Sequence, residues 1–248
     1  MQPRKARKKQ ASPGRAWVPI ALIGGAAIIV VVVVVIVSNV VGGGGPGVSP
    51  TRAAPGPTHA APQNGATAGQ DSAPATLVEY FRFDCSHCAD YALNTAPSIE
   101  KDYVDTGKLR IVFHPLALAS SGEVLTASEA ALCAGEQNRY WEFHDLVFAN
   151  FSTVNPYSTE NLKQYAKDLG LDTGAFNSCL DSDKYKDQII NDTNADVAAG
   201  VNSTPTFFLG TTSVMNSEVI PFKGSTEILG AQTYSTFKTD IDKVLAGQ

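Results

Sequence analysis

Basic residues are scarce in most of this sequence. Of the 19 lysines and arginines among its 248 residues, seven lie before residue 75, together with only one of the 24 acidic residues, Asp71. The stretch 75–248 is left with 12 basic and 23 acidic residues, a formal charge of −11. Nucleic-acid binding depends on lysines and arginines that neutralise phosphates. The scarcity of these residues therefore excludes nucleic acid as the expected partner.

Cysteine is also rare, and its arrangement limits the kinds of site the chain can form. There are four cysteines, Cys85, Cys88, Cys133 and Cys179, and only the first two form a C-x-x-C pair. A zinc site needs further ligands, and the sequence has no second C-x-x-C and no H-x-x-x-H pattern. We therefore expect no metal ion and no cofactor. An even number of cysteines fits two disulfides in an oxidising compartment.

A long apolar run stands near the start of the chain. Residues 18–41 are apolar apart from Ser38 and Asn39. A helix of this length extends about 36 Å, enough for a hydrocarbon core of about 30 Å. Six basic residues precede it, so the positive-inside rule predicts a cytoplasmic tail at 1–17, a transmembrane anchor at 18–41 and an extracytoplasmic remainder. A cleaved signal peptide is the alternative, although its apolar core of roughly 7 to 15 residues would be shorter.

Large apolar residues are almost missing from residues 42–74, which are rich in Gly, Pro, Ala, Ser and Thr. Such a stretch cannot bury enough surface to offset the entropy lost on ordering. We predict a flexible linker over 42–74, with His59 exposed to solvent, and a globular part that starts near Ala75.

From residue 75 onward the pattern predicts an α/β fold. An apolar strand at 75–83 precedes a helix at about 86–106, which Pro97 is expected to kink, and a second strand at 108–114. This order implies a right-handed parallel crossover. The remaining expected elements are helices near 121–136, 139–150, 158–169, 172–180 and 183–199, strands at 204–209 and 219–224, and a helix at 232–246. An all-helical insert at about 120–201 therefore interrupts the α/β layer.

Four residues, Cys85-Ser86-His87-Cys88, lie where the first strand ends and a helix begins. Unpaired N–H groups and the helix dipole stabilise a thiolate at such a position, which predicts Cys85 as the nucleophile and Cys88 as the resolving thiol. His87 is expected to give the Cys85 thiolate a hydrogen bond or a positive charge, whereas Asp84 opposes the thiolate by repulsion. A structural disulfide is the alternative, but closing so short a loop constrains the unfolded chain little.

The order of elements and three motifs together resemble the thioredoxin fold, and specifically the DsbA-like thiol-disulfide oxidoreductases. In that family a helical domain interrupts the thioredoxin core. The motifs are the C-S-H-C sequence, the Y-W-E-F-H-D-L-V-F helix at 140–148 and the V-N-S-T-P-T-F-F-L-G segment at 201–210. The resemblance covers about residues 75–248. Family members commonly have proline where this chain has Ser86.

The resemblance also implies roles for residues outside the dithiol. Pro205 is expected to be cis and to face the dithiol, with Thr204 tuning the hydrogen bonding of the thiolate and the release of a bound peptide. Glu79 matches the family's buried acid. A carboxylate in an apolar strand has a raised pKa and can accept the proton of Cys88. A glutamate that reaches solvent at the strand end is the alternative.

Cys133 and Cys179 lie on two expected helices of the insert. Two free thiols would not persist beside an oxidase in an exported domain, so we expect a structural disulfide between them. A second redox relay is the alternative.

Together these features predict a membrane-anchored, extracytoplasmic thiol-disulfide oxidoreductase that introduces disulfides into reduced, unfolded exported proteins. The resemblance implies that a membrane quinone-linked partner, DsbB-like or VKOR-like, reoxidises it. A disulfide reductase or isomerase using the same site is the first alternative. A non-catalytic thioredoxin-fold module that binds a partner or acts as a chaperone is the second.

Overall fold

The computed structural model describes residues 52–56, 58–118, 122–216 and 222–247. The predicted cytoplasmic tail and the predicted transmembrane anchor at 18–41 lie outside these ranges. Within the described ranges, no helix combines the length and the apolar character needed to cross a membrane. The anchor therefore stays a prediction.

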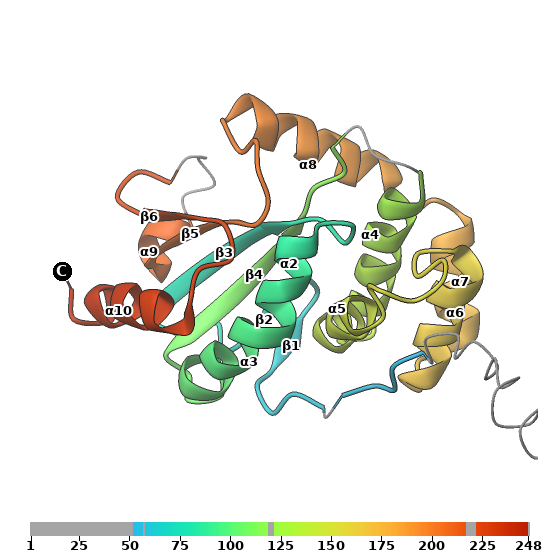
Figure 1. Ribbon diagram of the computed structural model, residues 1–248, viewed down its shortest axis with the longest axis horizontal. Helices are drawn as coiled ribbons and strands as arrows, with labels where there is room; N and C mark the ends of the chain where they lie inside the picture. Colours follow the sequence, from blue (N-terminus) through green and yellow to red (C-terminus); the bar gives the residue numbers. More distant parts are fainter. Residues whose placement is uncertain (1–51, 57, 119–121, 217–221, 248) are drawn as a thin grey trace, which may run out of the picture. The chain divides into compact units, whose positions relative to one another are not determined.

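The described part of the chain is built on one six-stranded sheet with the order β1-β2-β4-β3-β5-β6 (Figure 1). Its strands are β1 (Gln63–Asn64), β2 (Thr67–Ala68), β3 (Ala75–Phe81), β4 (Leu109–Pro115), β5 (Thr206–Thr211) and β6 (Thr226–Leu229). The central strand β3 pairs in parallel with β4 and antiparallel with β5. All seven of its residues are buried, as expected for a strand that is covered on both faces.

Side chains of β3 alternate between two hydrophobic cores. Leu77 and Phe81 point into the larger core, whereas Val78 and Tyr80 point into the smaller core on the other face. Glu79 shares the face of Leu77 and Phe81 and is only 1% exposed. An ionisable side chain therefore lies inside the main core.

The helix that follows β3 carries the dithiol. It runs through α2 (Ser86–Asp90), η1 (Tyr91–Thr95), α3 (Ala96–Ile99) and η2 (Glu100–Val104), in which α-helical and wider π-helical turns alternate. Pro97 lies in the first turn of α3, directly after the wide turn η1. A proline cannot donate the usual helical hydrogen bond, and the wider turn before it accommodates this loss without ending the helix.

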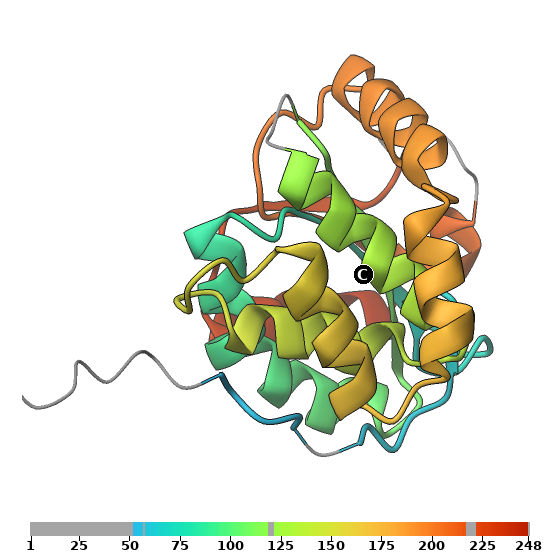
Figure 2. The same ribbon diagram turned by 90° about the vertical axis from the view of Figure 1, so that its right-hand side faces the viewer.

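Five helices form the insert: α4 (Gly122–Gly135), α5 (Tyr140–Ala149), α6 (Thr159–Asp168), α7 (Thr173–Asp181) and α8 (Lys186–Ala198). Figure 2 shows them facing the viewer. The short helix α9 (Thr212–Met215) and the last helix α10 (Tyr234–Leu245) follow β5 and β6. The α/β fold of the thioredoxin type with a helical insertion is thereby confirmed.

The predicted linker is wrong over the part that the structure describes, which begins at Arg52. From Arg52 the described residues contact the insert, since Arg52 pairs with Asp168 at 2.6 Å and the Ala53 N–H donates to Asn150 at 2.8 Å. The hairpin β1–β2 then adds to the edge of the sheet through β4. Backbone hydrogen bonds and small buried residues such as Ala68 hold this segment in place. The prediction failed because it relied on the absence of large apolar residues, which this kind of packing does not need.

The predicted strand at 219–224 is also wrong where it can be compared. Residues 217–221 lie outside the described ranges, and Phe222 begins a turn that closes with the Ser225 N–H donating to its carbonyl at 3.0 Å. The strand that pairs with β5 is β6, in which only Ile228 is buried. An edge strand of this kind shows no apolar alternation, whereas the apolar sequence at 219–222 has the composition of a strand and was therefore predicted as one.

Candidate active site

The junction of β3 and α2 places Cys85 at a helix N-terminus. Cys85 is the N-cap of α2, and its sulfur accepts a hydrogen bond from the Cys88 N–H at 3.3 Å. Both cysteines are free thiols in the structure; Cys85 is half-buried and Cys88 is fully buried. An incoming sulfur can therefore reach Cys85 but not Cys88.

The surroundings of Cys85 favour its thiolate. A hydrogen bond from the Cys88 thiol, with further ones from Thr204 and from the backbone N–H groups of Cys88 and His87, outweighs the effect of burial and lowers the Cys85 pKa to about 5. Cys85 is therefore mainly a thiolate at neutral pH, the form that attacks disulfides and leaves from them.

Cys88 shows the opposite behaviour. Burial, the hydrogen bond to the Cys85 sulfur and the nearby Glu79 charge raise the pKa of Cys88 above its ordinary value. The pKa values of the two thiols in this short motif are therefore shifted in opposite directions. Cys88 keeps its proton and must lose it before it can attack.

The loop before β5 faces the dithiol. The Thr204–Pro205 peptide bond is cis, and the Cys85 sulfur lies 3.3 Å from the Thr204 carbonyl oxygen, to which the thiol donates when it is protonated. The fold thus brings together two segments that are 119 residues apart in sequence. The roles of Thr204 and Pro205 in peptide binding and release stay predictions.

Glu79 lies beneath this site. Its side chain is 1% exposed, and its Oε1 atom has no hydrogen-bond partner among the described residues. Burial, with the charges of Glu100 and Asp145, raises the Glu79 pKa well above its ordinary value. The side chain does not reach solvent, and its role as the proton acceptor for Cys88 stays a prediction.

His87 and Asp84 flank the nucleophile on the surface. Both are exposed, and the backbone N–H of His87 contributes to the lowered pKa of Cys85. Asp84 is held by Arg82, whose Nε donates to Asp84 Oδ1 at 2.8 Å. The repulsion expected from Asp84 is therefore offset by a neighbouring positive charge.

The other two cysteines form a disulfide. Cys133 of α4 and Cys179 of α7 are joined with their Cα atoms 5.9 Å apart. This bond links two helices of the insert, away from the free dithiol.

Sequence reasoning missed one contact at the site. Tyr157, in the loop between α5 and α6, donates its hydroxyl to the Phe83 carbonyl oxygen at 2.7 Å. Phe83 lies just before the dithiol turn, so the insert supports this turn directly. A tyrosine in an irregular loop carries no sequence signal for such a role.

A cluster of ionisable groups, missed as well, joins the segment before β1 to the helices. His59 Nε2 lies 2.8 Å from Asp145 Oδ2, and His59 Nδ1 lies 3.8 Å from Glu100 Oε2. The prediction that His59 is solvated is wrong, because its side chain is only 16% exposed. One ligand atom from each of the three lies within 4.8 Å of the others, but His59 and Asp145 bond each other directly, which indicates an ion pair and not an open coordination shell.

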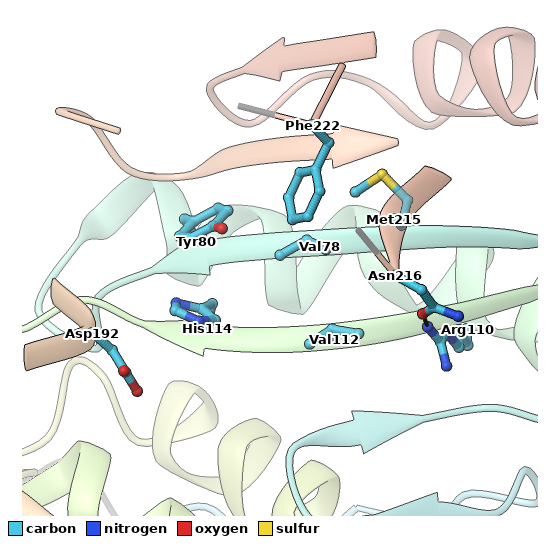
Figure 3. Close-up of a pocket in the computed structure, with 9 residues that line it drawn as sticks. All are labelled: Val78, Tyr80, Arg110, Val112, His114, Asp192, Met215, Asn216 and Phe222. Atoms are coloured by element: carbon cyan, nitrogen blue, oxygen red, sulfur yellow. Dashed lines mark hydrogen bonds between the residues drawn. The ribbon is translucent and has the colours of Figure 1, made fainter. Parts of the chain in front are cut away.

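A cavity of about 790 Å³ lies on the face of the sheet opposite to the dithiol and Glu79 (Figure 3). Tyr80, His114 and Phe222 line it, and Arg110 and Asn216 bond each other at one end. Tyr80 belongs to the smaller core, whereas the dithiol and Glu79 lie on the side of the larger one. This cavity is therefore separate from the dithiol.

A thiolate at a helix N-terminus, a buried resolving thiol and an opposing cis-proline, all on a thioredoxin core with a helical insert, define the DsbA-like thiol-disulfide oxidoreductases of the thioredoxin superfamily. A family model described as Thioredoxin matches residues 62–242. The chain belongs to this family.

Individual proteins show the same relationship. The crystal structure of alpha-DsbA1 from Wolbachia pipientis superimposes with a TM-score of 0.64 and 27% identity, covering 73% of this chain and 91% of that one. A Rickettsia bellii protein, provisionally named a protein-disulfide oxidoreductase, is 29% identical over 63% of this chain and 61% of its own length. The Na(+)/H(+) antiporter NhaA 3 of Salinispora tropica is 34% identical over 57% of this chain, but the match covers only 21% of the antiporter. The chain thus spans between about a fifth and three fifths of these curated relatives.

Proposed function

We propose that this chain works as a thiol-disulfide oxidase that transfers its Cys85–Cys88 disulfide to proteins with two free thiols. The observation that carries the proposal is the position of Cys85 at the N-terminus of α2, where the Cys88 N–H donates to its sulfur at 3.3 Å. This position lowers the pKa of Cys85 to about 5, beside a buried Cys88 with a raised pKa. A stabilised thiolate favours the reduced enzyme, so the disulfide form readily gives its oxidising equivalents away.

The chemistry follows from the different exposure of the two sulfurs. A substrate thiolate attacks the half-buried Cys85 sulfur, the Cys85–Cys88 bond breaks, and Cys88 leaves and takes up a proton. The second substrate thiolate then attacks the substrate sulfur of the mixed disulfide. The substrate disulfide forms, and Cys85 leaves as a thiolate.

The size of the effect can be estimated from the Cys85 pKa. Lowering it from 9.0 to about 5 favours the reduced form at pH 7 by about 100-fold, or about 60 mV for a two-electron couple. This figure is a ceiling, because Cys85 is half-buried and water screens part of the charge.

The proposal includes a setting outside the cytoplasm. Its support is the apolar stretch 18–41 preceded by six basic residues, which would anchor the chain with its dithiol domain on the far side of the membrane. Reduced, unfolded exported proteins would be the substrates, and a membrane quinone-linked protein of the DsbB or VKOR type would reoxidise Cys85 and Cys88. The name of the Rickettsia bellii relative supports the same class of reaction.

The test is oxidative refolding of a reduced protein whose activity needs its disulfides. The oxidised full chain should restore that activity, whereas Cys85→Ser should not. Equal refolding by both would assign the fold to a non-catalytic module. Equilibration with glutathione then gives the direction: a potential toward the DsbA end, about −120 mV, supports the oxidase, and one near about −270 mV would favour a reductase.

A further inference from the structure

Proton transfer to and from Cys88 presents a physical problem. Cys88 is fully buried and gains a proton when the disulfide is reduced, then loses it again on reoxidation. Glu79 is the acid that interacts with it, but Glu79 is 1% exposed and is itself cut off from water. Some path must therefore carry protons between Glu79 and solvent.

A line of closely spaced ionisable side chains leads away from this region. His144 Nδ1 lies 2.9 Å from Asp145 Oδ1, Asp145 Oδ2 lies 2.8 Å from His59 Nε2, and His59 Nδ1 lies 3.8 Å from Glu100 Oε2. Imidazoles and carboxylates alternate along this line. An imidazole can take a proton on one ring nitrogen and release one from the other, so the order suits proton transfer.

The outer end of the line opens to solvent. His59, Glu100 and Asp145 line a cavity of about 280 Å³, together with Lys101 and Asp105. Burial, with the neighbouring Asp145 charge, raises the Glu100 pKa to about 8. Glu100 can therefore exchange protons with water near neutral pH.

The inner end points toward Glu79. His144 is 2% exposed, and its ring lies 4.8 Å from the rings of both Phe81 and Phe113. Phe113 is the β4 partner of Glu79, and Phe81 follows Glu79 on the same face of β3. The ring of His144 thus lies over the two side chains that flank Glu79.

Polar atoms without partners gather at this inner end. In the described part of the chain these buried atoms include Glu79 Oε1, His144 Nε2, Tyr140 Oη and Tyr91 Oη. Burial is the main cause of the raised pKa of Tyr91 and Tyr140, and the Glu79 charge raises it further. Both hydroxyls therefore lie within the electrostatic reach of Glu79. Buried polar groups of native proteins are commonly bridged by ordered water.

We propose that His144, Asp145, His59 and Glu100 form a proton relay that connects Glu79, through bridging water at His144 Nε2, with the solvent-filled cavity. The inference rests on the proposed function, because it supplies the proton step of that reaction. On reoxidation, Glu79 first releases its own proton through the relay, the Cys88 proton then passes to the Glu79 carboxylate, and the Cys88 thiolate attacks the mixed disulfide at Cys85. On substrate oxidation, the protons travel inward.

Packing holds the relay in place. The His59 ring stacks on Trp141 with the ring centroids 3.6 Å apart and the planes within 4°. Trp141 Nε1 also donates to Glu100 Oε1 at 3.0 Å. One side chain therefore orients both groups at the outer end, and a phenyl ring at position 59 would preserve the stack while removing both nitrogens.

The test isolates the step that needs the Cys88 proton. The reduced full chain is mixed with oxidised glutathione and quenched at intervals, and the species are resolved by mass spectrometry. Cys85 first forms a mixed disulfide with glutathione; Cys88 then attacks it and releases glutathione. His59→Phe and Asp145→Asn should slow the second step about 10-fold or more and leave the first unchanged. The solvent deuterium isotope effect on the second step should also differ between each of these variants and the wild type.

Two comparisons separate the relay from a structural effect. Asp105→Asn removes a carboxylate from the same cavity that acts on Glu100 only through a minor charge interaction, and it should keep a rate close to that of the wild type. His59→Ala leaves space beside Trp141, and added imidazole should restore its second step. Imidazole should not restore the step in Asp145→Asn, because the next carrier is missing there.

The outcomes distinguish the relay from the proposed function. A wild-type chain that forms the mixed disulfide but never resolves it would remove the proposed function itself. Wild-type resolution with unchanged rates and isotope effects in folded His59→Phe and Asp145→Asn would overturn the relay alone. A second step that stops with a chelator and returns with Zn²⁺ would assign the cluster to a metal and also overturn the relay.

Discussion

At the scale of single residues, the acidity of Cys85 is the property on which most of the chemistry depends. Its pKa of about 5 predicts that alkylation of the reduced chain by iodoacetamide rises with a midpoint near pH 5. Thr204→Val should move this midpoint upward, because the Thr204 side chain contributes to the stabilisation. Mass spectrometry of the Cys85 peptide gives the rate at each pH, and a midpoint near 9 would contradict the assignment.

Glu79 should affect stability as well as proton transfer. Burial raises its pKa in the folded state, so the folded chain keeps a proton that the unfolded chain loses above about pH 4.5. This contribution to stability is full below that pH and is lost as the pH rises through the raised folded-state pKa. Glu79→Gln should therefore unfold in urea with a weaker dependence on pH between 5 and 8.

The matched control for this measurement is Glu227→Gln, which changes an exposed glutamate of β6. Its unfolding free energy should follow the wild type at each pH. If Glu79→Gln also followed the wild type, the buried carboxyl would not be protonated in the folded chain.

The sequence predicted the site residues unevenly. Cys85 and Cys88 follow from helix-terminus electrostatics, which is a local property. The cis bond at Pro205 came only through family resemblance, because no local pattern distinguishes it from other X-Pro bonds. The buried position of His59 could not be predicted, because its partners Asp145 and Trp141 lie more than 80 residues away and its flanking sequence resembles a linker.

At the scale of elements, the disulfide between α4 and α7 should contribute substantially to stability. Its two cysteines are 46 residues apart, and the chain-entropy estimate for closing such a loop is about 4 kcal/mol. The double variant Cys133→Ser/Cys179→Ser should lose about that much unfolding free energy in urea, while Cys85 keeps its alkylation profile. A loss below about 1 kcal/mol would place the stability of the insert in its packing instead.

The hairpin β1–β2 gives a second prediction at this scale. Gly69 has φ +98°, and a Cβ atom there would lie 2.8 Å from the Leu109 carbonyl oxygen. Gly69→Ala should therefore cost about 2 kcal/mol or more in unfolding free energy. Gly65→Ala is the matched control, with φ +56° and nothing within 4 Å, and should cost about 1 kcal/mol. Equal losses would mean that the close approach to the Leu109 carbonyl oxygen does not contribute to the loss of unfolding free energy.

The elements divide by the kind of signal each one gives. The helices of the insert and the strands β3 and β4 have clear periodicity, so their positions agreed with expectation within a few residues. The hairpin β1–β2 and the edge strand β6 are held by backbone pairing with strands that are distant in sequence. Such pairing leaves little trace in side-chain composition, which is why the hairpin was predicted as linker and β6 was misplaced.

At the scale of the whole molecule, reduction should stabilise the fold in a pH-dependent way. The folded-state pKa of Cys85 is depressed, so its contribution to the stability of the reduced form is full above pH 9 and is lost as the pH falls through about 5. The melting temperature of the reduced chain minus that of the oxidised chain should decrease between pH 7 and pH 5. A difference that stays constant over this range would show that the thiolate is not what favours the reduced form.

The topology of the sheet also bears on how the chain reaches its fold. β3 meets its parallel partner β4 soon after it is made, but its antiparallel partner β5 follows only after the whole helical insert. Pairings between distant segments form slowly, and an unpaired strand edge can join another chain in the meantime. The apolar central strand, Ala75–Phe81, is therefore the segment whose aggregation during synthesis should limit the yield of folded protein.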